Sequence, residues 1–136
     1  MELTVTYLGG AQFEAEARGH KIYSDQPLFN HGHDEGMTPP EFLLASVGTC
    51  AGYYAAEYLN KHNLPAKQLR VKVTAEKALK PARLARFTVT VETPGVHEPE
   101  HLGGVKLVVE KCLVKNTLQI PPEITVDVVS EVTVGA

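Results

Sequence analysis

The longest predicted helix of this sequence opens with Thr38-Pro39-Pro40-Glu41-Phe42-Leu43-Leu44-Ala45-Ser46-Val47-Gly48-Thr49-Cys50. Thr at the N-cap, Pro at the first helical position and Glu at the third form a capping box. Apolar residues continue around every side of this helix, which we expect to reach about His62. Such a helix is buried all round, and in a short chain that burial predicts a curved sheet and a second subunit. Gly48, Gly52 and Ala56 lie four apart, which predicts a strip where another backbone can approach closely.

Alternating patterns on both sides of the helix predict strands. Six segments alternate between apolar and polar residues: 2–8, 12–18, 20–25, 69–76, 84–92 and 124–134. Gly19 can supply a positive φ for the turn between the second and third strands, and 26–37 form a polar loop. A second helix is expected over 98–113, before breaks at Asn116 and Pro121-Pro122. This order predicts one α+β domain over residues 1–136 with largely antiparallel pairing.

The composition excludes several classes of protein. Hydrophobic residues make up 43% and charged residues 21%, with a net charge of -3, which is typical of a globular chain. We expect no nucleic-acid partner and no membrane partner, because neither a basic stripe nor a cationic amphipathic face is present. The longest uncharged run, residues 42–56, is shorter than the roughly 20 residues that span a bilayer. The N-terminus lacks a signal-peptide pattern, so we expect a cytoplasmic protein.

The two cysteines, Cys50 and Cys112, are the first candidates for chemistry. They form no C-x-x-C motif, and three interpretations stay open: inert core residues, a structural disulfide, or a reactive pair. A reactive Cys50 needs a nearby cation or helix N-terminus to stabilise its thiolate. A break of the helix at Gly48-Thr49 would supply a helix N-terminus. The arginines that could supply the cation are Arg18, Arg70, Arg83 and Arg86.

Other polar residues have a structural and a functional interpretation. Glu41 is first the acid of the capping box, and its second role would be to orient an arginine toward Cys50. The loop segment 30–35 holds His and carboxylate side chains that suit a metal, although such clusters are more often solvated turns. Tyr53 and Tyr54 follow Cys50 by three and four residues and could line a pocket or form core or dimer contacts.

Two segments resemble the OsmC/Ohr family. The run from Thr38 to Cys50 is similar to that family's first-cysteine segment, T-P-x-E-L-L-L-A-S-L-G-x-C. Cys112-Leu113-Val114-Lys115-Asn116-Thr117-Leu118 is similar to the second-cysteine segment, C-P-V-x-N-x-L. This chain has Leu113 where a Pro commonly follows the second cysteine. The segment from Arg18 to Pro27, followed by Gly32 and Gly36, also resembles OsmC-like sequences.

The resemblance implies an OsmC-like fold, in which curved, largely antiparallel sheets wrap two long central helices of an intertwined homodimer. It implies active sites at the subunit interface with no metal and no organic cofactor. It also implies roles for four residues. Cys50 attacks the peroxide, Cys112 resolves the product, Arg18 holds the thiolate and Glu41 orients that arginine.

Three hypotheses follow for function. The first is a thiol-dependent peroxide reductase that takes organic hydroperoxides in preference to hydrogen peroxide and is recycled by a thiol reductant of unknown identity. The second is a non-catalytic, OsmC-like stress protein that binds a small molecule at the dimer interface. The third is a stable dimer whose cysteines are unreactive core residues.

Overall fold

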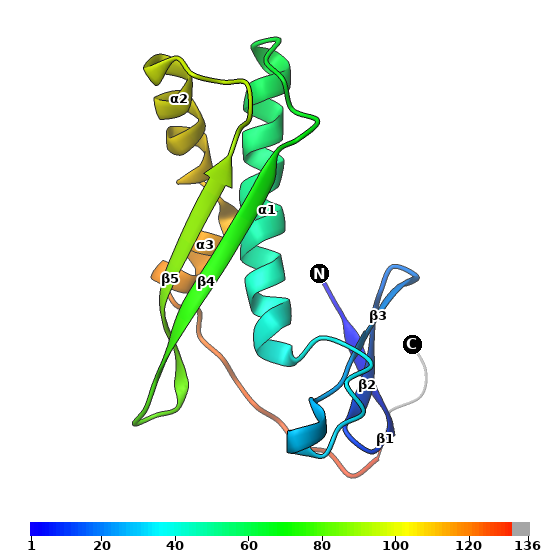
Figure 1. Ribbon diagram of the computed structural model, residues 1–136. Coiled ribbons are helices and arrows are strands. Elements are labelled where there is room, and N and C mark those ends of the chain that lie inside the picture. The colour runs from blue at the N-terminus through cyan, green and yellow to red at the C-terminus, as the bar shows by residue number, and fades with distance from the viewer. Residues whose placement is uncertain (132–136) are drawn as a thin grey trace.

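The computed structural model describes residues 1–131 and confirms the α+β class. Its strands are β1 (Thr4–Gly9), β2 (Gln12–Ala17), β3 (His20–Ser24), β4 (Arg70–Ala78) and β5 (Arg83–Glu92). Its helices are η1 (Leu28–Asn30), α1 (Pro39–Lys61), α2 (Pro99–Val109) and α3 (Leu113–Gln119). Both sheets are antiparallel, with the orders β1-β2-β3 and β4-β5. Figure 1 shows α1 beside the β4-β5 hairpin and α2, while the β1-β2-β3 sheet lies beyond the start of α1.

The capping box that predicts the start of α1 is present. The carboxylate of Glu41 accepts hydrogen bonds from the backbone N–H of Thr38 at 2.9 Å and from its hydroxyl at 2.8 Å. The helix then runs unbroken to Lys61, and Asn63 follows in the left-handed conformation that commonly ends a helix. The helix therefore ends where the sequence predicts, and no break at Gly48-Thr49 supplies a helix N-terminus to Cys50.

The apolar residues of α1 are not buried on all sides within one chain. The buried stripe has a spacing of four residues and consists of Val47, Ala51, Ala55 and Leu59. Tyr53 points away from this stripe and is 64% exposed. The small-residue strip receives side chains of β4, because a Cβ on Gly48 would lie 3.1 Å from Val73 Cγ2. The glycines thus bring a strand of the same chain against the helix.

The second half of the chain departs from the sequence prediction at two places. The helix expected over 98–113 ends at Val109, and α3 follows it with Cys112 as its N-cap. Asn116 lies inside α3 and does not break the chain. The strand expected over 124–134 is absent from residues 124–131, which are exposed and pair with no strand of the described chain, and residues 132–134 lie outside the described part. A strand requires a hydrogen-bonding neighbour, and this segment has none within the described residues.

Candidate active site

The fold brings the two cysteines together. Cys50 lies in the middle of α1, and Cys112 stands at the start of α3, which packs against α1. Both thiols are free, and each shifts the pKa of the other. Cys112 is only 1% exposed, whereas Cys50 is half-buried. Cys50 is therefore the accessible thiol, and Cys112 is the protected one.

The surroundings shift the pKa values of the two thiols in opposite directions. Burial acts to raise the pKa of Cys50, but hydrogen bonds from the Cys112 thiol and from two backbone N–H groups of α3 bring it below the ordinary value. These N–H groups belong to Val114 and Leu113. Burial raises the pKa of Cys112, and its hydrogen bond to Cys50 raises it further. Cys50 is thus the thiol that ionises first.

The helix N-terminus beside Cys50 is that of α3. The chain leaves α2 after Val109 and turns so that Cys112 has extended backbone angles (φ -56°, ψ 127°) before α3 begins. The first N–H groups of a helix have no partner within it, and they are free to face an anion. The sequence prediction missed α3. Its usable signals were the apolar pair Val114 and Leu118, four residues apart, and the Pro121-Pro122 stop.

No arginine of the described chain contributes to the pKa of Cys50. Arg18 lies in the turn between β2 and β3, with a positive φ of 52° beside Gly19 at 83°. Arg70 and Arg86 form ion pairs with glutamates of the β4-β5 sheet at 3.9 and 3.7 Å. Arg83 donates to two backbone carbonyls at the β4-β5 turn. Within one chain, hydrogen bonds alone favour the thiolate.

Glu41 is occupied by its capping role. Hydrogen bonds from the backbone N–H and the hydroxyl of Thr38 hold the pKa of Glu41 below its ordinary value. Its carboxylate forms no ion pair within the described residues. The structure therefore shows that Glu41 fixes the start of α1. Within the described residues, Arg18 forms no ion pair with Glu41.

The polar loop before α1 is organised around Asp25, which is 1% exposed. Its carboxylate accepts hydrogen bonds from the Gln12 side chain at 3.0 Å and from the backbone N–H groups of Gln26, His33 and Glu35 at 2.7 to 3.2 Å. Led by the bond from Gln12, these bonds lower the pKa of Asp25 to about 2. Asp25, His33 and Glu35 place potential metal ligands within 4.8 Å of one another. Both carboxylate oxygens of Asp25 already accept hydrogen bonds from N–H donors. We therefore interpret the role of Asp25 as stabilising the fold of this loop.

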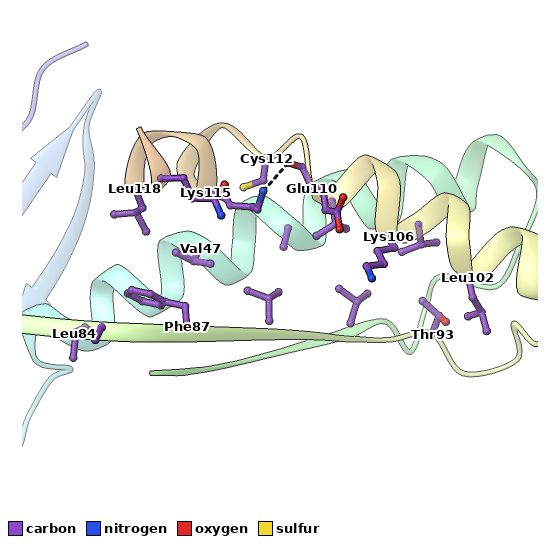
Figure 2. Close-up of a pocket in the computed structure, with 17 residues that line it drawn as sticks. Val47, Leu84, Phe87, Thr93, Leu102, Lys106, Glu110, Cys112, Lys115 and Leu118 are labelled. Carbon is purple, nitrogen blue, oxygen red and sulfur yellow. Dashed lines mark hydrogen bonds between the residues drawn. The ribbon is translucent and has the colours of Figure 1, made fainter. Parts of the chain in front are cut away.

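A groove of about 760 Å³ has Cys112 among its lining residues, whereas Cys50 does not line it. It lies between β5 and the helices, and Figure 2 shows Phe87 beside β5, Val47 on α1, and Cys112 and Lys115 at the upper edge. Its remaining lining is mostly aliphatic, with Lys106 and Glu110 among the few charged residues. Tyr53 and Tyr54 do not line this groove; their rings meet edge to face at 5.7 Å. The groove suits an apolar molecule and borders the buried thiol.

These features define a small α+β protein with a dithiol site at a helix–helix contact. The sequence model of the family described as OsmC-like protein matches residues 32–127. The chain therefore belongs to the OsmC-like protein family, and the resemblance seen in its two cysteine segments is confirmed.

Solved structures share this fold at low sequence identity. A protein from Psychrobacter arcticus has a TM-score of 0.77 at 19% identity, over 85% of each chain. An OsmC-like protein from Mycoplasma pneumoniae has a TM-score of 0.73 at 18% identity, over 87% of this chain and 86% of that one. An organic hydroperoxide resistance protein OsmC from Legionella pneumophila has a TM-score of 0.58 at 15% identity, over 88% and 90%. No match was found among curated protein sequences. None of the described helices is long and apolar enough to cross a membrane.

Proposed function

We propose that this protein is a thiol-dependent peroxide reductase in which Cys50 attacks the peroxide and Cys112 resolves the product. The observation that carries the proposal is the meeting of two free thiols whose pKa values are shifted in opposite directions. A peroxidatic cysteine must be an accessible thiolate, and a resolving cysteine must lie beside it. The partial exposure and lowered pKa of Cys50, and the buried Cys112 that shifts its pKa, support this assignment of roles.

The reaction balances with the two thiols and one external reductant. The Cys50 thiolate attacks one peroxide oxygen, the O–O bond breaks, and an alcohol leaves after taking one proton, while Cys50 becomes a sulfenic acid. The sulfur of Cys112 then displaces the sulfenic hydroxyl as water, and a Cys50–Cys112 disulfide forms. A dithiol reductant returns both cysteines to thiols and is itself oxidised to a disulfide.

The groove supports organic hydroperoxides as the preferred substrates. Its aliphatic lining and its position beside Cys112 would bury an alkyl or aryl group that hydrogen peroxide lacks. The same groove is also the observation that favours the second candidate function, the binding of an apolar small molecule without turnover. The two functions differ in whether the thiols are consumed.

A homodimer is part of the proposal, and the β1-β2-β3 sheet supports it. Its register places Val5 opposite Ala15 and Ala15 opposite Ile22, and Tyr7 opposite Phe13, so one face of the sheet is apolar. This face packs against no helix of the described chain (Figure 1). Val5, Tyr7 and Ile22 are each about half exposed, at 56%, 60% and 49%. A second copy of the chain would cover this face.

The C-terminal segment also supports a second copy. Ile124, Val126 and Val128 alternate as in a strand, yet they are 79%, 82% and 92% exposed. Their segment passes from α3 toward the β1-β2-β3 sheet without pairing with it (Figure 1). Pairing with a partner chain would give the backbone its hydrogen bonds and cover these side chains.

The function is tested by following free thiols after the reduced protein is mixed with cumene hydroperoxide or hydrogen peroxide. We expect rapid loss of both thiols, faster with cumene hydroperoxide, and steady turnover when dithiothreitol is supplied. Cys50→Ser should abolish peroxide consumption, whereas Cys112→Ser should leave one round of oxidation that ends at a sulfenic acid. Unchanged thiols together with a co-purified apolar molecule in the groove would instead establish the binding function.

A further inference from the structure

Cys112 belongs to the short turn that connects α2 to α3. Two backbone hydrogen bonds close this turn: the N–H of Lys111 donates to the carbonyl of Val108, and the N–H of Cys112 donates to that of Val109, each at 3.1 Å. The carbonyl of Glu110 receives no backbone N–H within residues 1–131. The last carbonyls of a helix have no partner inside it, so another donor must satisfy this one.

The side chain of Lys115 supplies that donor. Its Nζ reaches back from α3 and donates to the backbone carbonyl of Glu110 at 3.1 Å, and Figure 2 shows this bond at the edge of the groove. Lys115 is half-buried and lines the groove together with Cys112. A cation near the C-terminus of a helix is also favoured by the helix dipole. Lys115 therefore ties the end of α2 to the first turn of α3.

The same residue acts on the Cys112 thiol through its backbone. Burial raises the pKa of Cys112, and the backbone N–H of Lys115 opposes that rise as a hydrogen-bond donor. One residue thus contacts the turn at two places, with its ammonium on the Glu110 carbonyl and its N–H toward the sulfur of Cys112. Loss of the ammonium would free the Glu110 carbonyl and loosen the turn that carries Cys112.

We propose that Lys115 is a positioning residue that holds the turn between α2 and α3 so that the sulfur of Cys112 can reach the sulfur of Cys50. The inference rests on the proposed function and concerns its second step, in which Cys112 displaces the sulfenic hydroxyl. A group that is held at its target reacts much faster than one that must find it. Fast closure of the disulfide also protects Cys50, because a sulfenic acid that waits is oxidised further to sulfinic acid.

Mixing the reduced protein with dithiobis-nitrobenzoate tests the positioning without any peroxide. The Cys50 thiolate attacks one sulfur of this aromatic disulfide, whose S–S bond breaks, and a first coloured nitrothiobenzoate leaves. Cys112 then loses its proton to solvent and attacks the sulfur of Cys50, which expels the second nitrothiobenzoate and forms the Cys50–Cys112 disulfide. The rate of the second release therefore measures how readily Cys112 reaches Cys50.

The variant Lys115→Met keeps the aliphatic stem in the groove and removes the ammonium. We expect its first release to stay close to that of the wild type and its second release to slow by about fivefold or more. Lys115→Arg keeps a cationic donor and should restore the second rate. Lys111→Met is the matched control, because Lys111 is an exposed lysine of the same turn that does not line the groove.

A second release at the wild-type rate in Lys115→Met would overturn the inference, and so would equal slowing in Lys111→Met or in Lys115→Arg. The same variants are then treated with excess cumene hydroperoxide, where Lys115→Met should accumulate more sulfinic acid than the wild type, read by intact mass. A wild type that closes its disulfide with the aromatic reagent but does not react with peroxide would refute the proposed function and leave the positioning by Lys115 standing.

Discussion

The thiolate of Cys50 is stabilised, within one chain, by hydrogen bonds. Two of the donors are backbone N–H groups at the start of α3, and one of these belongs to Leu113. A proline at position 113 would have no N–H to donate. Leu113 thus gives Cys50 a donor that a chain with proline at this position would lack.

The variant Leu113→Pro removes this backbone N–H donor and should change little else in the structure. Position 113 is the first residue of α3, and the extended Cys112 before it suits a following proline, so the helix should keep its start. We expect the pKa of Cys50 to rise, because a hydrogen bond to an anion is lost. Leu113→Ala, which removes the side chain and keeps the N–H, is the matched control.

The measurement is the rate of Cys50 alkylation by iodoacetamide as a function of pH, read by peptide mass. A lowered pKa means that the thiolate is present above the folded pKa and is lost as the pH falls through it. The wild-type rate should therefore rise with pH at a midpoint below the ordinary value for cysteine, and the Leu113→Pro curve should move to higher pH. Coincident curves for the Pro and Ala variants would show that the N–H of residue 113 does not lower the pKa of Cys50.

Among the elements, those specified by local signals were predicted from sequence, and those specified by packing were not. The Thr38 and Glu41 cap and the Gly19 turn fix the start of α1 and the β2-β3 hairpin through contacts between near neighbours. The division between α2 and α3 was missed because it depends on how the chain packs against α1. Local hydrophobic periodicity does not report that packing. The segment 124–131 has strand periodicity but pairs with no strand among residues 1–131. The meeting of Cys50 with Cys112 depends on the same packing.

The contact between α1 and α2 can be tested with two adjacent glycines. A Cβ at Gly104 would overlap Tyr58, whereas a Cβ at Gly103 meets nothing within 4 Å. Gly103→Ala should stabilise the protein by up to about 1 kcal/mol through helix propensity. Gly104→Ala should destabilise it by about 1–3 kcal/mol because Tyr58 must move. Equal stability of the two variants in urea unfolding would contradict this packing of α1 on α2.

Within residues 1–131, the apolar face of the β1-β2-β3 sheet packs against no helix, and Arg18 does not contribute to the pKa of Cys50. Arg18 lies in the turn of that sheet, so we expect it to reach Cys50 of the partner when the two copies associate. Arg18→Ala should then lower kcat/KM by about tenfold or more, since a cation beside a thiolate lowers its pKa by a unit or more. Arg70→Ala, in the β4-β5 sheet, is the control and should retain activity.

Mixed dimers distinguish an arginine of the partner from one of the same chain. Subunits with Arg18→Ala are mixed with subunits carrying Cys50→Ser, and exchange is allowed to reach equilibrium. If Arg18 acts across the interface, each mixed dimer holds one intact site, and the mixture recovers about a quarter of wild-type activity. If Arg18 acts within its own chain, the mixture stays at the level of the parent variants. Sedimentation at micromolar concentration should give a dimer, and a monomer would contradict the assembly.

The central claim is that the two sulfurs of one chain react together, and intact mass after a single equivalent of cumene hydroperoxide tests it most directly. We predict a loss of about two protons per chain, one disulfide peptide that joins Cys50 to Cys112, and a monomer on a non-reducing denaturing gel. An unchanged mass, or a disulfide that links Cys50 of one chain to Cys50 of another, would contradict it.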